Sequence, residues 1–153
     1  MRTQAVASAL LAFAVSASCS AGAEEKPGDQ RLLQGEWECV ASFKEGKQTQ
    51  SYLGVRATIQ DNRLTWSFPK PDGTKRVQRT VFKLDPSKTP KHFDWNPEDK
   101  PTEVHRRLYV LEGNTLTWVT NLGMPGHEHE DVRPESLATG KWRFVMKRIQ
   151  PKK

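Results

Sequence analysis

The feature that most constrains the fold of this chain is a two-residue alternation of apolar and polar side chains. The segment RLLQGEWECVASF, residues 31–43, shows it first. Successive side chains of a strand point to opposite faces, and the alternation therefore predicts a strand with one buried face. Val40 is the one apolar residue on the polar face, and the residues expected on the buried face are Trp37, Cys39, Ala41 and Phe43.

The same alternation recurs in seven further segments, which are separated by residues that favour turns. Asp61-Asn62 and Pro71-Asp72-Gly73 are two such turns, because these residue types accept the tight backbone angles that a turn needs. The chain shows almost no helical period. The further strands are expected at 55–60, 63–68, 77–84, 92–95, 104–111, 115–120 and 141–149.

About eight short consecutive strands predict an all-β fold, either a sandwich or an antiparallel up-and-down barrel. A bulky aromatic residue falls on the apolar face of most strands, which favours a closed barrel filled from all sides. These rings either fill the core or also line a small ligand pocket at the barrel mouth. The pocket or core residues are expected to be Trp37, Trp66, Phe68, Trp95, Trp118, Trp142 and Phe144.

Residues 1–23 are expected to be an export signal. Arg2 precedes a short apolar run, and Ala21-Gly22-Ala23 has the pattern of a cleavage site. Ser16-Ala17-Ser18-Cys19 resembles a lipoprotein box, in which Cys19 would be acylated, although Ser16 stands where that box prefers leucine. Both routes remain open. Residues 24–31 are expected to form a linker, and 32–150 a single domain.

The composition excludes some function classes. The net charge is +6, but the basic residues are scattered, whereas a nucleic-acid surface would cluster them with exposed aromatics. The apolar run in the export signal is too short to span a membrane as a helix. Loss or acylation of Cys19 leaves Cys39 as a single thiol, so no disulfide is expected. We therefore expect an exported protein of the periplasm or cell envelope, or a secreted one.

Several motifs together resemble an uncharacterised family of small exported bacterial proteins, abundant in planctomycetes and described as lipocalin-like. They are Leu-Gln-Gly-Glu-Trp at 33–37, the Phe-x-Leu-Asp-Pro segment at 82–91, the Tyr-x-Leu segment with its Gly-Asn turn at 109–116, Arg133-Pro134, and Lys147-Arg148. The chain departs from the family pattern at Leu137, where phenylalanine is expected, and in the His-Glu-His-Glu sequence at 127–130. The resemblance implies a fold and a location, but no activity.

The resemblance also implies how one end of the barrel is closed. In lipocalin-like barrels the glycine, here Gly35, lets the first strand bend across the barrel floor, because glycine accepts backbone angles closed to other residues. The tryptophan, here Trp37, plugs that floor. A cation from the last strand lies over its indole ring. Arg148 is the expected cation, with Lys147 as the second candidate, and the Arg148 guanidinium should therefore contact Trp37.

Few residues suggest chemistry. His127 and His129 would point the same way on an extended segment, with Glu128, Glu130 and Asp131 as additional oxygen ligands, but a metal site needs three or four converging ligands. They lie in the long segment 121–140, which has no clear period. Cys39 is expected to be a small buried residue rather than a nucleophile, and His92 and His105 ordinary strand residues. No common nucleotide-binding or hydrolase motif is present, and no cofactor is expected.

The sequence thus predicts a lipocalin-like barrel whose function is non-enzymatic binding of a small, partly apolar ligand or a cell-envelope component. Two alternatives remain. One is an interaction or structural module with a filled interior and no ligand. The other is a hydrolase or metal-dependent enzyme that uses the 121–140 loop. The oligomeric state and the ligand are not predicted.

Overall fold

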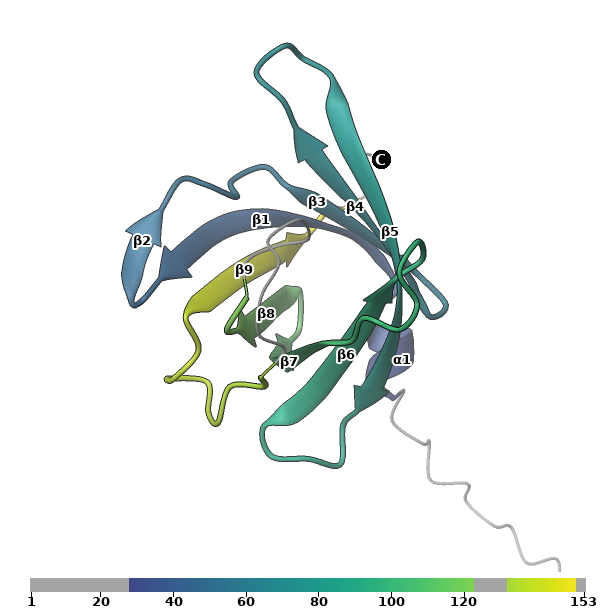
Figure 1. Cartoon of the computed structure of the whole chain (residues 1–153), viewed down its shortest axis with the longest axis vertical. Coiled ribbons are helices and arrows are strands. Elements are labelled where there is room, and N and C mark those ends of the chain that lie inside the picture. Colours follow the sequence, from purple (N-terminus) through teal and green to yellow (C-terminus); the bar gives the residue numbers. More distant parts are fainter. Residues whose placement is uncertain (1–27, 123–131, 151–153) are drawn as a thin grey trace, which may run out of the picture.

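A computed structural model describes residues 28–122 and 132–150. The export signal, Cys19, His127 and His129 lie outside these ranges. The described residues form one short helix and nine strands (Figure 1). The elements are α1 (Asp29–Leu32), β1 (Gly35–Lys44), β2 (Lys47–Thr49), β3 (Arg56–Gln60), β4 (Arg63–Pro69), β5 (Lys75–Asp85), β6 (Lys91–Pro97), β7 (His105–Glu112), β8 (Thr115–Thr120) and β9 (Trp142–Arg148).

The strands form one antiparallel sheet that closes into a barrel of eight strands. From β3 to β9 each strand pairs with the next along the chain, and β1 pairs with β3 on one side and β9 on the other. The three-residue β2, which was not expected, pairs with the far end of β1 beyond β3. The predicted all-β up-and-down barrel is therefore confirmed. No helix within the described ranges is long and apolar enough to traverse a bilayer.

A β-bulge in β1 corrects one part of the sequence interpretation. The pairing of β1 with β9 shifts register between Cys39 and Ala41, which leaves Val40 as the extra residue, 46% exposed. A bulge reverses the inward and outward positions beyond it. Ser42 is consequently buried. Ala41 and Phe43 leave the inward face, and the Arg143 guanidinium lies 4.3 Å from the centre of the Phe43 ring.

The barrel interior is filled mainly by aromatic rings from different strands. Trp66 lies against Trp118 with ring centres 5.2 Å apart, and Phe93 packs edge-on against Trp118 at 5.5 Å. Such pairs contribute about 0.5–1.5 kcal/mol each beyond the burial of their surface. Trp37, Trp66, Trp95, Trp118 and Phe144 are almost completely buried, Phe68 is nearly so, and Trp142 is half-buried.

The floor of the barrel has the geometry expected from the resemblance. Gly35 has φ +115°, which other residues rarely adopt, and a Cβ there would lie 3.0 Å from the Arg148 guanidinium. Arg148 lies 4.2 Å from the centre of the Trp37 ring, so the predicted contact is present. The Trp37 indole donates a hydrogen bond to the Leu33 carbonyl at 2.9 Å. Arg148 also donates to the carbonyls of Leu32 and Gln34.

The helical turn α1 occupies the end of the segment expected to be a linker. Its Asp29 side chain accepts hydrogen bonds from Lys91 in β6 and Tyr109 in β7. These contacts tie the turn beneath the barrel, and the Arg148 bonds hold its last carbonyls. A turn this short is unstable alone and depends on such tertiary contacts.

Residues 132–140 form no strand and cover the outside of β7 and β8. Leu108 and Val119 are buried there although they point away from the interior. Gly140 approaches so closely that a Cβ would lie 2.2 Å from a Val119 methyl group and 3.4 Å from Pro134. Only a residue without a side chain fits this contact.

The floor contact leads to a stability prediction. Replacing Arg148 with methionine removes the cation–π contact, worth about 0.5–2 kcal/mol, and hydrogen bonds from a charged group, worth about 1.5–3 kcal/mol. We expect Arg148→Met to lower the free energy of unfolding by about 2–4 kcal/mol in urea titrations. Lys147→Met, at the exposed neighbouring position, should change it by less than about 0.5 kcal/mol. Equal effects would contradict this account of the floor.

Candidate functional site

Arg107 is the most unusual residue inside the barrel. It lies on β7, where His105, Arg107 and Tyr109 all face inward, and it is only 1% exposed. Tyr109 reaches α1 at the floor, so Arg107 and His105 lie towards the opposite end. Its guanidinium carbon is 4.8 Å from the centre of the Trp95 ring. Burying a charged group is costly, and large costs of this kind are found mainly where the charge has a task.

The electrostatics of Arg107 follow from this burial. Removal from water lowers the pKa of Arg107 to about 9, while the Tyr52 hydroxyl acts in the opposite direction. The side chain is therefore cationic at pH 7. Tyr52 belongs to the connection between β2 and β3, so groups from separate parts of the chain converge here.

Trp95 and His105 complete this group of side chains. The imidazole of His105 stacks on the Trp95 ring with centres 4.3 Å apart and planes 18° apart. Its Nε2 lies 2.9 Å from a carboxylate oxygen of Glu103. Trp95 thus contacts both a guanidinium and an imidazole. We call Tyr52, Trp95, His105 and Arg107 the Arg107 cluster.

Three indole N–H groups are buried with no hydrogen-bond partner among the described residues. They belong to Trp66, Trp95 and Trp118. Leaving a buried donor unpaired costs about 1–3 kcal/mol, and folded proteins avoid it. Trp37 at the floor, in contrast, has its carbonyl partner. The interior beyond the floor therefore holds donors that an acceptor group would satisfy.

Aromatic rings also form a rim beside the cluster. Tyr52 packs edge-on against Trp142 at 5.2 Å and against Phe144 at 5.1 Å, and Trp142 stacks on Phe144 at 5.8 Å. Trp142 is the part of this rim that is only half-buried. A partly exposed ring next to buried rings is the kind of surface on which apolar ligands bind.

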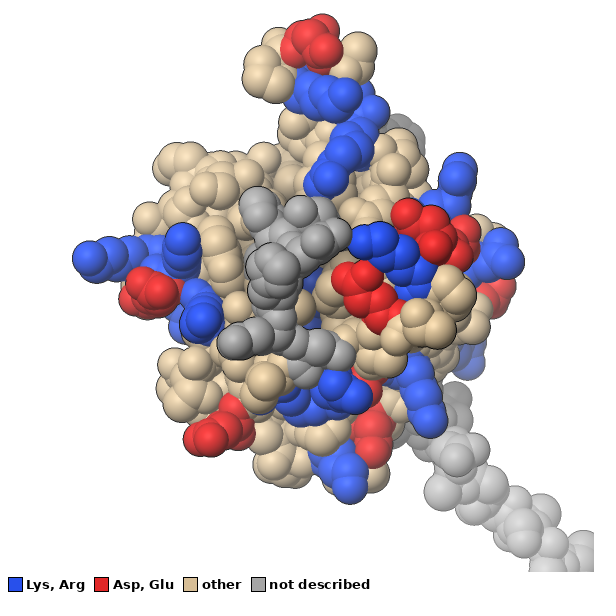
Figure 2. All heavy atoms as spheres, in the orientation of Figure 1, with Lys and Arg blue, Asp and Glu red and all other residues tan. Residues whose placement is uncertain are grey.

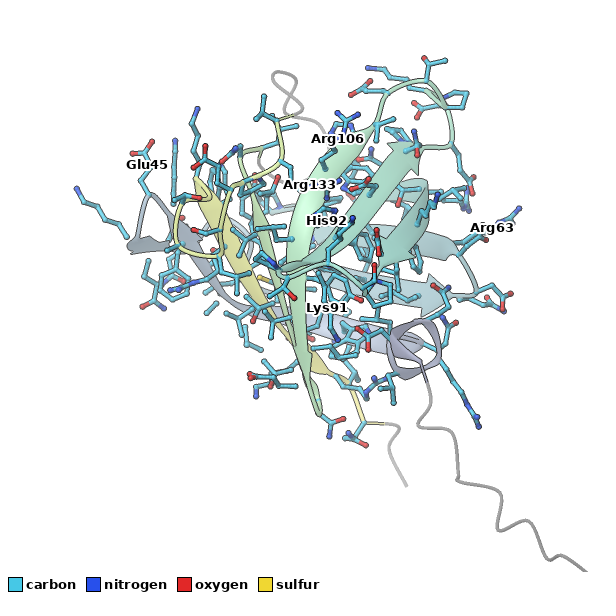
Figure 3. All side chains as sticks on the ribbon, turned by 90° about the horizontal axis from the view of Figure 1, so that it is seen from below. Glu45, Arg63, Lys91, His92, Arg106 and Arg133 are labelled. Carbon is cyan, nitrogen blue, oxygen red and sulfur yellow. The ribbon has the colours of Figure 1, made fainter. Side chains whose placement is uncertain are left out.

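An ion pair fixes the strand that carries Arg107. Arg133 lies 2.7 and 2.9 Å from the two carboxylate oxygens of Asp94 on β6, and donates to the Arg107 carbonyl at 2.7 Å. Figure 3 shows Arg133 near His92 and Arg106 along the β6–β7 pair. A forked Arg–carboxylate pair is geometrically specific. It therefore holds β6, β7 and residues 132–140 in one arrangement.

A second polar group lies at the floor. Asp29 accepts hydrogen bonds from Lys91 at 2.7 Å and Tyr109 at 2.6 Å. Burial acts to raise the pKa of Asp29, but these two donors outweigh it and lower that pKa. Burial, together with Asp29, raises the pKa of Tyr109. All three side chains are used in holding α1, so this group is structural.

The other candidates from the sequence are distributed as follows. Cys39 is buried, and burial raises the pKa of its thiol to about 11, which disfavours the reactive thiolate. Burial, and then the charge of Arg133, lower the pKa of His92. Within the described ranges, no group of three or more His, Cys, Asp or Glu side chains is arranged to hold a metal.

The sequence analysis missed the Arg107 cluster, although the necessary signal was present. Tyr109 was on the predicted strand 104–111, and a period of two places Arg107 and His105 on the same face. Charged residues are seldom buried, and the strand therefore suggested nothing unusual. The convergence of Tyr52 and Trp95 on Arg107 had no sequence signal.

Two hollows lie away from this cluster. One, of about 610 Å³, lies beside α1 and the β3–β4 turn, and includes Gln30 and Asp61. The other, of about 340 Å³, lies between the β5–β6 connection and β7, and includes Leu111 and Leu137. Figure 2 shows acidic and basic side chains interspersed over the face in view, with basic ones along the projecting β4–β5 hairpin.

No protein-family model matches the chain, and no curated protein or solved structure is significantly similar to it. The functional argument therefore depends on the geometry of the Arg107 cluster and its aromatic surroundings.

The floor group leads to a pH-dependent prediction. The pKa of Asp29 is lower in the folded chain than the usual value of about 3.9, so the ionised carboxylate stabilises the fold above that pH. We expect Asp29→Asn to reduce the free energy of unfolding by about 1.5–3 kcal/mol at pH 7. The deficit should shrink as the pH falls below about 4 and wild-type Asp29 is protonated.

Urea unfolding at pH 7, 5 and 3 measures this difference. Asp99→Asn, at an exposed turn position, is the matched control and should show no such pH-dependent deficit. A deficit for Asp29→Asn that stays constant down to pH 3 would contradict the role of the carboxylate charge.

Proposed function

We propose that this chain is an exported lipocalin-like barrel that binds a small, partly apolar molecule at the Arg107 end of its interior. The observation that carries the proposal is the set of buried indole N–H donors without partners, belonging to Trp66, Trp95 and Trp118. A ligand with an acceptor atom would satisfy donors that the described chain leaves unpaired. The aromatic surroundings would pack against its apolar part.

The rim supports an entry from this end. Trp142 is half-buried while its neighbours Tyr52 and Phe144 are buried. An incoming apolar group would extend the existing ring contacts and displace water from the exposed part of Trp142. The floor offers no comparable position, because Trp37 and Arg148 are occupied with one another and with backbone carbonyls.

A second candidate is a filled module that binds no small molecule. The close contacts among Trp66, Phe93 and Trp118 favour it, since these rings already use much of the interior. In that case the indole N–H groups would face neighbouring ring surfaces, a weaker interaction than a normal hydrogen bond. The metal-dependent alternative depends on His127 and His129, which lie outside the described residues, and no observation favours it.

A neutral fluorescent probe distinguishes the first two functions. We expect N-phenyl-1-naphthylamine to bind one-to-one with a blue-shifted, enhanced emission, because it enters an apolar site. Trp142→Ala removes the rim ring and should weaken binding about tenfold, equivalent to about 1.4 kcal/mol. Phe43→Ala removes a ring from the outward side of β1 and should leave binding unchanged. Saturation absent up to the solubility limit of the probe would favour the filled module.

Export and family membership follow from the sequence motifs and form part of the proposal. When the full chain is expressed in a bacterial host, we expect intact-mass analysis to find a mature protein that begins at Glu24. Acylation at Cys19 would instead yield a heavier, membrane-associated product that Cys19→Ser abolishes. Recovery of the uncleaved chain from the cytoplasm would contradict export.

A further inference from the structure

We propose that the ligand of this barrel is a small monocarboxylic acid with an apolar body, and that its carboxylate pairs with Arg107 inside the barrel. This inference rests on the proposed function and names the class of ligand. It also assigns Arg107 as the residue that determines specificity for an acid over a neutral compound of the same shape.

The first argument is the charge of Arg107. Its guanidinium is 1% exposed and lies on an aromatic ring, so it receives little solvation from water. A cation in such an environment attracts an anion more strongly than it would at the surface. A guanidinium has five N–H donors in a planar fork that fits a carboxylate through two parallel hydrogen bonds. One protein partner would leave further donors of that fork available to a ligand.

The second argument is a donor on the ring that contacts Arg107. The Trp95 indole N–H is buried without a partner among the described residues, and the same indole ring contacts the guanidinium. An acceptor held by Arg107 would therefore lie close to an indole that needs one. Two independent features, a buried cation and an unpaired donor, thus point to one acceptor group.

The third argument is that the cluster is held rigidly before any ligand arrives. Trp95 is stacked on His105, which is held by Glu103 at 2.9 Å. The backbone carbonyl of Arg107 is held by Arg133, and Arg133 by Asp94. A preorganised site loses less free energy to ordering when it binds.

The charge of the cluster favours a carboxylate over a phosphate. Arg107 supplies one positive charge inside the barrel, which matches the single negative charge of a carboxylate. A phosphate monoester carries more negative charge and three acceptor oxygens. Burying the additional charge would be costly. The remaining surroundings, with Tyr52, Trp66 and Phe68, are aromatic and fit an apolar body.

The test compares an acid with its uncharged ester. 1-Naphthylacetate and methyl 1-naphthylacetate share one apolar body, and each is titrated against wild-type protein carrying N-phenyl-1-naphthylamine. At pH 7 we expect the acid to displace the neutral probe at a concentration at least about tenfold lower than the ester, equivalent to about 1.4 kcal/mol. Because this comparison uses the wild type, it does not depend on a variant that folds.

Variants then assign the preference to Arg107. Arg107→Met should reduce the preference for the acid to less than about threefold while the ester still binds. Arg107→Lys, which keeps the charge but loses the planar fork, should retain an intermediate preference. Arg106→Met changes the exposed neighbouring arginine and should keep the full preference. Circular dichroism confirms that each variant used is folded.

The outcomes separate the two proposals. If the neutral probe binds but the acid has no advantage over the ester, the inference is overturned and the proposed binding function stands. An acid preference that survives in folded Arg107→Met would also overturn the inference. If neither the probe nor either naphthyl compound binds, the proposed function fails and the inference fails with it.

Discussion

The pairing of β1 with β9 is the interaction on which the rest of this structure depends. It turns a row of antiparallel strands into a closed ring, so that eight inward faces share one interior and the main sheet has no free edge. The bulge at Val40 lets β1 pair with β9 along its length and with β3 and then β2 on its other side. Without this closure, the tryptophans of separate strands would have no common core.

The two ends of the interior differ in how completely their polar groups are satisfied. At the floor, the Trp37 N–H, the Arg148 guanidinium and the Asp29 carboxylate all have partners, and each partner also holds the α1 turn. At the other end, a buried guanidinium shares its space with unpaired indole donors. Proteins retain such unfavourable groups mainly where they have a function. This contrast favours a binding role for the Arg107 end over a purely structural one.

Much of the fold could be predicted from alternation and turn residues, whereas the site could not. The floor contact between Trp37 and Arg148 was expected from a motif, and the described structure contains it. Phe43 was assigned to the wrong face, because a bulge appears only when two strands are paired. Arg107 was overlooked because its strand position predicted burial while its charge predicted exposure. The cover formed by residues 132–140 had no period at all and depends on close approach at Gly140.

The sequence by itself determined that the chain forms consecutive half-buried strands, because the direction of a side chain from a strand depends only on the parity of its position. It also determined that bulky rings on those strands must meet in one core. Only the tertiary structure decided which residues meet across the barrel, including Tyr52, Trp95 and Arg107 from distant parts of the chain. That choice depends on strand register and ring closure, which arise from long-range pairing and have no local signature in the sequence.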